Sequence, residues 1–414
     1  NRKKGGKLKL LILKAITITC LTLLPVSVLA GAADGLTDLL IEKGVITKDE
    51  LKAQQKKRWL NVEGRIQARY TWHENDDPKD NTSELSLPRV RFGASGAAFE
   101  NIEYKLEIDF IPDAKQKETL TANTTTGAVS SAKGDIESAT KVSLKDAKVV
   151  FTHLPYAHLT VGHFKVPFSR QELTSSGNQQ FVNRAEINKE VQGRDVGFMI
   201  GEYSGKKMFE YAVGAFNGTK TANKNDNDGF LVAGRIAFNP FGELKYSESN
   251  IEGESLRLSV GVNVQTNKIT TSGTNKKLDF SGSSDDLDTD TTKYGVDLGI
   301  KFLDNAALFA EYIQSKSEPE TGTEVKAKGY YVQGGYFVLP PRLEATARYE
   351  WYDPDDSVDN TSDIKWTTVG LNYFFKKHDW KVQANYVIKD EKEDPTSGKK
   401  KDDDTFLLQL QVKF

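Results

Sequence analysis

The five histidines are the chain's first candidates for acid–base or nucleophilic chemistry. Nucleophilic catalysis needs a hydroxyl or thiol within hydrogen-bond reach of such a base, which a third group orients. His153 and His158 flank a predicted turn, and His163 lies outside any nucleophile motif. The sequence therefore predicts a protein that is not an enzyme. The five positions are His73, His153, His158, His163 and His378.

Metal and redox chemistry find few ligands in this sequence. The one cysteine, Cys20, lies in an N-terminal segment that we expect to be removed. Its removal excludes disulfides, thiolate metal sites and thiol catalysis, and no C-x-x-C-H motif exists for covalent haem. The segment Ser281–Thr292 carries four aspartates (Asp285, Asp286, Asp288 and Asp290), but their spacing does not match a Ca²⁺ loop. We expect a solvated acidic loop there, and no metal or cofactor.

Basic side chains that could bind anions are concentrated in the first part of the chain. Guanidinium groups present a fork of donors that suits phosphate and carboxylate oxygens. The opposite interpretation is that Glu103, Glu107 and Asp109 neutralise them as ordinary salt bridges. Both interpretations stay open at this point. The basic residues expected on one wall are Arg65, Arg69, Arg89, Arg91 and Lys105.

The N-terminus has the pattern of a secretory signal peptide over residues 1–30. Basic residues precede an apolar run, and Val28-Leu29-Ala30 offers a cleavage site. Removal of this segment leaves 50 of the 56 Lys and Arg residues against 58 Asp and Glu, a net charge of about −8. Residues 31–60 are expected to form a periplasmic helical segment, in which Thr47-Lys48-Asp49-Glu50 reads as a capping box.

From residue 61 onward, short segments alternate apolar and polar residues with a period of two, which is typical of β-strands. Each is close to the roughly ten residues that a tilted strand needs to cross a membrane. Long polar connectors alternate with short ones, although the connector at Phe241–Glu254 is longer than expected for a short turn. The sixteen predicted strands are Asn61–Trp72, Arg89–Phe99, Asn101–Phe110, Asp146–Thr152, His158–Lys165, Asp195–Glu202, Phe209–Asn217, Phe230–Asn239, Ser255–Gln265, Tyr294–Phe302, Ala306–Gln314, Tyr330–Val338, Leu343–Trp351, Lys365–Phe375, Trp380–Lys389 and Thr405–Phe414.

This pattern predicts an all-β fold, a 16-stranded antiparallel transmembrane β-barrel over residues 61–414. The low apolar content, 38%, fits because only every second strand residue faces lipid. The terminal Phe414 lies on the lipid-facing side of the last predicted strand. A terminal phenylalanine of this kind resembles the signal that the outer-membrane assembly machinery recognises.

A barrel of this size encloses water, so the inward-facing charges would line a pore and sort ions. Buried without water, the same charges would be very costly. Besides the five basic residues of the first strands, the basic inward set includes Lys148, Arg235, Arg257 and Arg348.

Several motifs resemble those of the phosphate-selective porin O and P family of Gram-negative outer membranes. They are Val161–Phe168 (VGHFKVPF), Glu172–Ser176 (ELTSS), Gly193–Gly197 (GRDVG), Val213–Gly218 (VGAFNG) and Gly234–Pro240 (GRIAFNP). The resemblance implies a porin, usually trimeric, whose third extracellular loop folds inward and narrows the channel. By this resemblance the constriction loop is about residues 167–193. It is mixed in charge, with Arg170, Arg184 and Lys189 beside Glu172, Glu186 and Glu190.

The function expected from these observations is passive diffusion of small hydrophilic solutes through the outer membrane of a Gram-negative bacterium. A preference for anions such as phosphate is the finer expectation. Two alternatives are a barrel that sheathes a partner such as a multihaem cytochrome, and a structural or adhesive surface barrel. The expected partners are outer-membrane lipid, the permeating solutes, two further copies in a homotrimer and the assembly machinery, but no nucleic acid.

Overall fold

The structure is a computed structural model that describes Lys43 and residues 59–74, 81–115, 118–122, 129–133, 137–154, 156–202, 208–219, 225, 227–271, 287–320, 322–356, 363–391 and 404–414. The predicted signal peptide and nearly all of the predicted helical segment lie outside these residues. By internal contacts the chain divides into two units, residues 1–61 with 95–104, and residues 62–94 with 105–414. In the first unit Gly96 is required, because the carbonyl oxygen of Trp59 occupies the place of a side chain.

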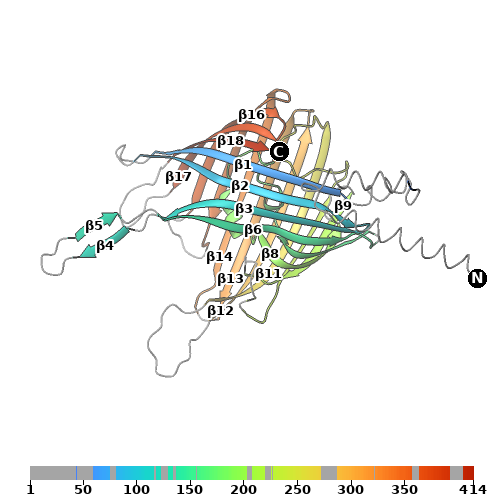
Figure 1. Ribbon diagram of the computed structural model, residues 1–414, viewed down its shortest axis with the longest axis horizontal. Helices are drawn as coiled ribbons and strands as arrows, with labels where there is room; N and C mark the ends of the chain where they lie inside the picture. Colours follow the sequence, from blue (N-terminus) through green and yellow to red (C-terminus); the bar gives the residue numbers. More distant parts are fainter. Residues whose placement is uncertain are drawn as a thin grey trace, which may run out of the picture. The chain divides into compact units, whose positions relative to one another are not determined.

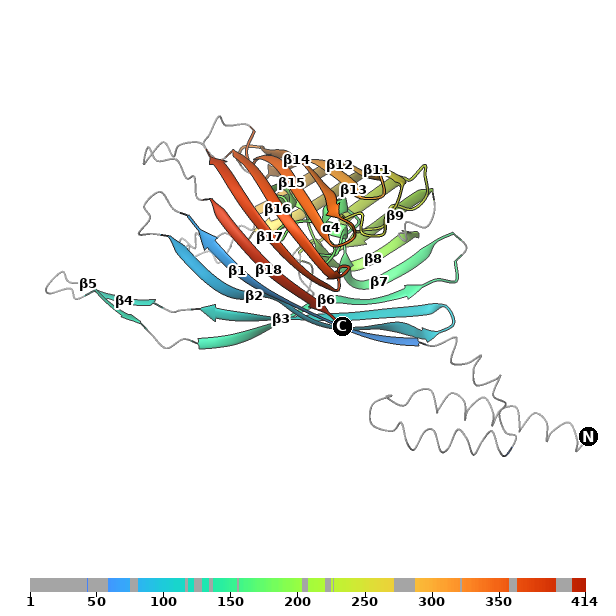
Figure 2. The ribbon, with the colours of Figure 1, turned by 90° about the horizontal axis from the view of Figure 1, so that it is seen from above.

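Sixteen of the described strands form a closed antiparallel barrel, as the sequence predicted. β1 and β18 lie side by side and close it, with registers from Arg65 opposite Lys413 to His73 opposite Thr405 (Figures 1 and 2). The barrel strands are β1 (Trp59–His73), β2 (Thr82–Phe99), β3 (Ile102–Lys115), β6 (Glu137–Phe151), β7 (His158–Lys165), β8 (Arg194–Glu202), β9 (Phe209–Phe216), β10 (Leu231–Phe238), β11 (Leu256–Thr271), β12 (Leu287–Phe302), β13 (Ala306–Pro319), β14 (Val325–Leu339), β15 (Leu343–Asp353), β16 (Ile364–Lys376), β17 (Trp380–Glu391) and β18 (Thr405–Lys413).

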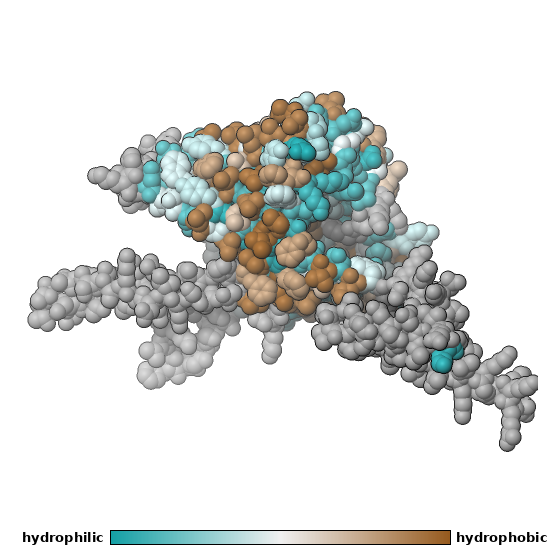
Figure 3. Space-filling view, turned by 45° about the horizontal axis from the view of Figure 1, so that its top comes forward, coloured by the Kyte–Doolittle hydropathy of each residue, from teal (hydrophilic) through white to brown (hydrophobic). Residues whose placement is uncertain are grey.

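Side chains alternate between the two faces of each strand. Apolar side chains face the outside of the barrel, and both polar and apolar side chains face the inside. On β10, Val232, Ile236 and Phe238 are exposed, whereas Leu231 and Arg235 are buried on the other face. Successive side chains of a strand point to opposite faces, so this arrangement follows from the sequence alone. Brown apolar residues cover much of the outer surface in Figure 3. Exposed apolar side chains on the outside are what a barrel in lipid requires.

Some strands are longer than predicted. β3 continues to Lys115, β6 begins at Glu137, and β11 reaches Thr271. The stretch between the predicted strands Asn101–Phe110 and Asp146–Thr152 also contains a two-stranded sheet, β4 (Glu118–Ala122) and β5 (Val129–Lys133). The prediction ended strands where apolar alternation ended. In water both faces of a ribbon accept polar residues, so backbone pairing continues beyond that point.

Two segments run into the barrel. The first, Val166–Gly193, joins β7 to β8 and contains α4 (Arg170–Leu173) and the 3₁₀ helix η2 (Glu186–Glu190). The second, residues 239–255, joins β10 to β11, and its Leu244, Ser249 and Asn250 are buried. We call them the inward loop and the inward turn. The sequence showed that the connector at Phe241–Glu254 is longer than a short turn, but it did not predict that the segment turns inward.

The C-terminal residue joins the wall through paired backbone bonds with Gly64. Gly64 N donates to Phe414 O (2.7 Å), and Phe414 N donates to Gly64 O (3.1 Å). The Phe414 ring lies over Gly64 and fills the space of the missing side chain. An aromatic ring that covers a strand glycine stabilises the strand pair.

We expect Gly64→Ala to weaken barrel closure, because the new methyl group collides with the Phe414 ring. Because the ring belongs to an exposed terminal residue and can move aside, the cost should lie at or below the lower end of the range of about 1–3 kcal/mol for overpacking in a closed core. The folded fraction should fall at a lower temperature in a gel-shift assay of unheated against heated protein. The control is Gly234→Ala, where the nearest atoms to an added Cβ lie at 3.8 and 3.9 Å. Equal melting of the two variants would contradict this account.

Candidate functional site

The inward loop is anchored at its start by apolar packing. Val166 and Phe168 are completely buried, and Phe168 belongs to a cluster with Phe309 and Ile313 of β13. Ser169 then begins α4, and its Oγ accepts a hydrogen bond from Glu172 N (3.1 Å). This capping bond satisfies a helix donor that would otherwise be unpaired inside the barrel. The Val-Pro-Phe sequence after β7 therefore directs the chain inward.

Carboxylates and amides on one wall hold the rest of the inward loop. Glu311 of β13 accepts from Ser169 Oγ (3.0 Å) and Arg170 N (3.1 Å). Further along the loop, Glu350 of β15 accepts from Glu186 N (2.6 Å). The other contacts on this wall are Gln180 Nε2 to Glu344 Oε1 (3.0 Å), Val182 N to Asn385 Oδ1 (2.8 Å) and Lys381 Nζ to Gln179 O (2.9 Å). The loop thus lies against β13–β17.

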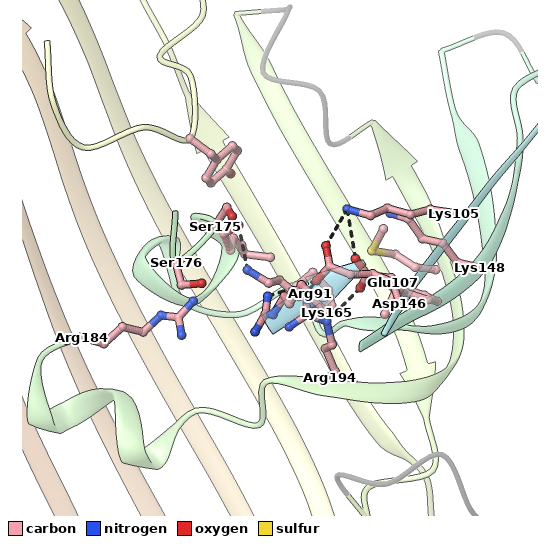
Figure 4. A pocket seen from close by; sticks show the side chains of 15 residues that line it. Arg91, Lys105, Glu107, Asp146, Lys148, Lys165, Ser175, Ser176, Arg184 and Arg194 are labelled. Carbon is pink, nitrogen blue, oxygen red and sulfur yellow. Dashed lines mark hydrogen bonds and ion pairs between the residues drawn. The ribbon is translucent and has the colours of Figure 1, made fainter. Parts of the chain in front are cut away.

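The opposite side of the loop borders an open cavity of about 300 Å³. Cationic side chains from β2, β3, β6, β7, β8 and the loop line it, together with the carboxylates of Glu107 and Asp146. Figure 4 shows Lys105 and Lys148 on one side of this cavity and Arg184 with Ser176 on the other. The lining cations are Arg91, Lys105, Lys148, Lys165, Arg184 and Arg194.

Part of this charge is cancelled within an ion-pair network. Lys105 Nζ lies 3.4 Å from a carboxylate oxygen of each of Glu63, Glu107 and Asp146. The remaining pairs are Arg91 Nη1 with Glu107 (3.0 Å), Arg91 Nε with Asp109 (2.8 Å), Arg194 Nε with Asp146 (2.8 Å), Arg194 Nη2 with Glu107 (3.9 Å) and Lys145 Nζ with Asp109 (4.0 Å). The network contains four cations and four carboxylates, so it adds no net charge.

Arg65 and Arg89 stand beside this network, outside the set of residues that line the cavity, and add positive charge to the wall. Among the described residues, their side-chain hydrogen bonds go to neutral groups, Arg65 Nη1 to Ser175 Oγ (3.1 Å) and Arg89 Nη1 to Gln67 Oε1 (2.9 Å). The charges acting most strongly on Arg89 are four other arginines, Arg91, Arg184, Arg65 and Arg69. Arg69 donates a hydrogen bond to Gln409 Oε1, and the negative charge of Glu84 interacts with its guanidinium group. The salt-bridge interpretation thus describes Arg91 and Lys105, whereas the anion-binding interpretation stays a prediction for Arg65 and Arg89.

Two cations of the cavity are used to hold the loop itself. Arg184 donates to the carbonyl oxygens of Gln171 (3.2 Å), Glu172 (3.2 Å) and Thr174 (3.1 Å). Lys165 donates to the carbonyl oxygens of Glu172, Leu173 and Thr174. These donors satisfy the carbonyl groups at the end of α4, which would otherwise be unpaired.

The other predicted site residues lie away from the cavity lining. Arg235 pairs with Asp297 in a fully buried contact on the barrel wall, and Arg348 bonds to Glu350 (3.0 Å) and Asn183 O (2.9 Å). Arg170 donates to Ser259 and to carbonyl oxygens of the inward turn. Arg257 contacts Phe241 O (3.1 Å), and the exposed Lys189 pairs with Glu186.

Sequence reasoning missed Lys145, Lys165 and Arg194. The last two were recognisable, because they are the residues directly before and after the inward loop and oppose each other in the β7–β8 register. Residues that flank an inward loop necessarily border the space that the loop narrows.

The part of the chain that the structure describes holds no group of three or more metal-ligating residues of the His, Cys, Asp and Glu types. Within the same residues, no helix is both long and apolar enough to span a bilayer.

The model of the family described as phosphate-selective porin O and P matches residues 60–414. An uncharacterised protein of Aquifex aeolicus is 28% identical over 424 residues, which cover 92% of this chain and 94% of that protein.

Solved structures with the same fold include porins of low sequence identity. An anion-selective porin from Comamonas acidovorans is 15% identical, with a TM-score of 0.54, over 86% of this chain and 100% of its own. The trimer form of OmpT from Vibrio cholerae has a TM-score of 0.55 and 11% identity, over 86% of this chain and 99% of its own. The outer membrane channel DcaP of Acinetobacter baumannii has a TM-score of 0.54 and 15% identity, over 87% and 98%. At these identities the likeness shows the fold.

Acidification should loosen the inward loop through Glu172. Burial raises the pKa of this carboxyl, but Arg184 and Lys165 outweigh burial and hold the pKa below its ordinary value of 4.5. A lowered pKa stabilises the folded loop above pH 4.5, and this contribution is lost as the pH falls through the folded value. Current recordings should therefore become noisier below pH 4.5.

The variant Glu172→Gln should show that noise already at pH 7, since the amide carries no charge for Arg184. Glu252→Gln, an exposed residue of the inward turn that pairs with Lys377 (2.7 Å), is the matched control. Quiet currents from Glu172→Gln at every pH would remove the carboxylate from this role.

Proposed function

This chain belongs to the phosphate-selective porin O and P family, and from that premise we propose that it passes small hydrophilic anions by passive diffusion. The protein is an outer-membrane channel of a Gram-negative bacterium. Phosphate is one anion of suitable size and charge. The proposal extends to anions in general, because the inward loop carries acidic residues as well as basic ones.

The excess positive charge of Arg65 and Arg89 is the observation that supports anion preference. Seven cations of the wall (Arg65, Arg89, Arg91, Lys105, Lys145, Lys148 and Arg194) face four carboxylates (Glu63, Glu107, Asp109 and Asp146). Fixed charges that line a water-filled constriction select ions of the opposite sign. The low-dielectric barrel wall focuses this field into the lumen.

Permeation in this proposal makes and breaks no covalent bond. The inward loop excludes large solutes, and the solute moves through the space left against β1–β3 and β6–β8. Guanidinium donors of Arg65 and Arg89 replace part of the anion's water shell as it passes. Because the attraction is shared among several groups in a wet cavity, the anion also leaves readily.

Assembly is proposed on the same basis. OmpT of Vibrio cholerae has a trimer form, and we extend a homotrimer to this chain. Phe414 is 73% exposed on the last strand, where the assembly machinery would reach it. The alternative of a sheath around a multihaem cytochrome has little support, because the inward loop and the inward turn occupy space that such a partner would need.

The test is the reversal potential of single channels in a salt gradient across a planar bilayer. The wild type should prefer anions, and the double variant Arg65→Gln with Arg89→Gln should lose most of that preference. A charge about 4 Å from an ion in water contributes about 1 kcal/mol, roughly a fivefold change in permeability ratio. Lys377→Gln, an exposed turn residue, removes a positive charge elsewhere and should change nothing. An unchanged reversal potential in the double variant would refute the assignment.

A further inference from the structure

The inward turn is much longer than two other turns at the same end of the barrel. β12 and β13 are joined by residues 303–305, and β14 and β15 by residues 340–342. The connection from β10 to β11 takes residues 239–255. A barrel needs only a tight turn there, so the additional residues require another explanation.

The middle of the inward turn is fixed against the barrel wall. Leu244 is completely buried against Gly299 of β12 and Phe309 of β13. Ser249 is also completely buried, and its Oγ donates to Glu344 Oε2 (2.8 Å). Ile251 packs with Phe337 and Phe374. Three separate side chains thus hold the segment inside the lumen.

The same segment contacts the inward loop at two places. At the tip of the loop, Glu248 N donates to Asn178 O (3.0 Å), and Gln180 N donates to Glu248 Oε2 (2.8 Å). Glu248 is thus held to the loop through both its backbone N–H and its carboxylate. Near the base of the loop, Arg170 Nη2 donates to Leu244 O (2.9 Å).

One residue of the inward turn reaches the open cavity. The ring of Tyr246 lines it, together with Ser175 and Ser176 of the inward loop. The Arg170 guanidinium carbon lies 4.6 Å from the centre of this ring, and the Tyr246 hydroxyl donates to Glu210 Oε2 (2.9 Å). Arg170 over the ring and Glu210 at its hydroxyl together fix the position of the Tyr246 ring at the cavity.

We propose that the inward turn is a second constriction element, which sets the size limit of the channel together with the inward loop. The inference rests on the proposed channel function. Residues 244–249 fill the lumen beside the loop, and Tyr246 forms part of the cavity border. Solutes are thereby confined to the side that carries Arg65 and Arg89. The determinant of exclusion size is shared between two segments that enter from β7 and from β10.

The test measures single-channel conductance and the largest polyethylene glycol that enters the pore. Tyr246→Ala should raise conductance and admit a larger polymer, because it removes a ring from the cavity border. Replacement of Leu244–Ser249 by a short Gly-Ser linker should raise conductance about twofold or more, since conductance follows the open cross-section. Both variants should also show a weaker anion preference, because solutes gain a path away from the arginines.

Two controls separate the ring from general loss of structure. Tyr246→Phe keeps the ring and loses only the bond to Glu210, so its conductance should match the wild type. Glu252→Gln changes an exposed end of the same turn and should also match. The folded state of each variant is checked by the gel-shift assay before recording.

The outcomes distinguish the two proposals. If the wild type forms no channel, the proposed function fails. If the wild type conducts and prefers anions, while both Tyr246→Ala and the linker variant keep its conductance and polymer limit, the inward turn is not a constriction and only this inference fails. If the linker variant does not fold, Tyr246→Ala against Tyr246→Phe decides the question.

Discussion

Backbone pairing without water is the constraint on which the rest of this structure depends. In lipid each peptide N–H and C=O needs a partner within the protein, so a sheet must close. Closure here runs through β1 and β18 and ends in the reciprocal bonds between Gly64 and Phe414. Once the sheet is closed, strand alternation forces half of the side chains inward. The charged half of a strongly charged sequence therefore becomes the lining of a lumen.

Inside the lumen, the charged residues of the two walls have different uses. Carboxylates on β13 and β15, such as Glu311 and Glu350, accept hydrogen bonds from the backbone of the inward loop. These acids are used to hold the loop in place. Of the cations on the first strands, Arg91 and Lys105 line the cavity that the loop leaves open. A mature chain with a net charge of about −8 can thus present a positive surface where a solute passes, because selectivity depends on local charge and not on the total.

The cations also differ in what they do. Lys165 and Arg184 bind main-chain carbonyl groups of the inward loop. Arg235 forms a buried ion pair with Asp297. Arg91 and Arg194 belong to a network that is neutral overall. Once these roles are assigned, Arg65 and Arg89 emerge as arginines of the first strands that take no part in this network. A count of basic residues on the inner face would have given all of them the same weight.

The sequence by itself determined the number of strands and which of their side chains point into or out of the barrel. Both follow from the period of two and from the alternation of long and short connectors, which depend only on neighbouring residues. It also determined which arginines of the first strands point inward. Tertiary structure alone decided which of these remain in excess, because the partners of Arg91 on β2 come from β3 and those of Arg194 on β8 come from β3 and β6. The sequence also did not show that the inward turn, residues 239–255, enters the lumen. Leu244 and Glu248 contact residues of β12, β13 and the inward loop. These residues are far away in the sequence, and a local sequence pattern cannot predict contacts between them.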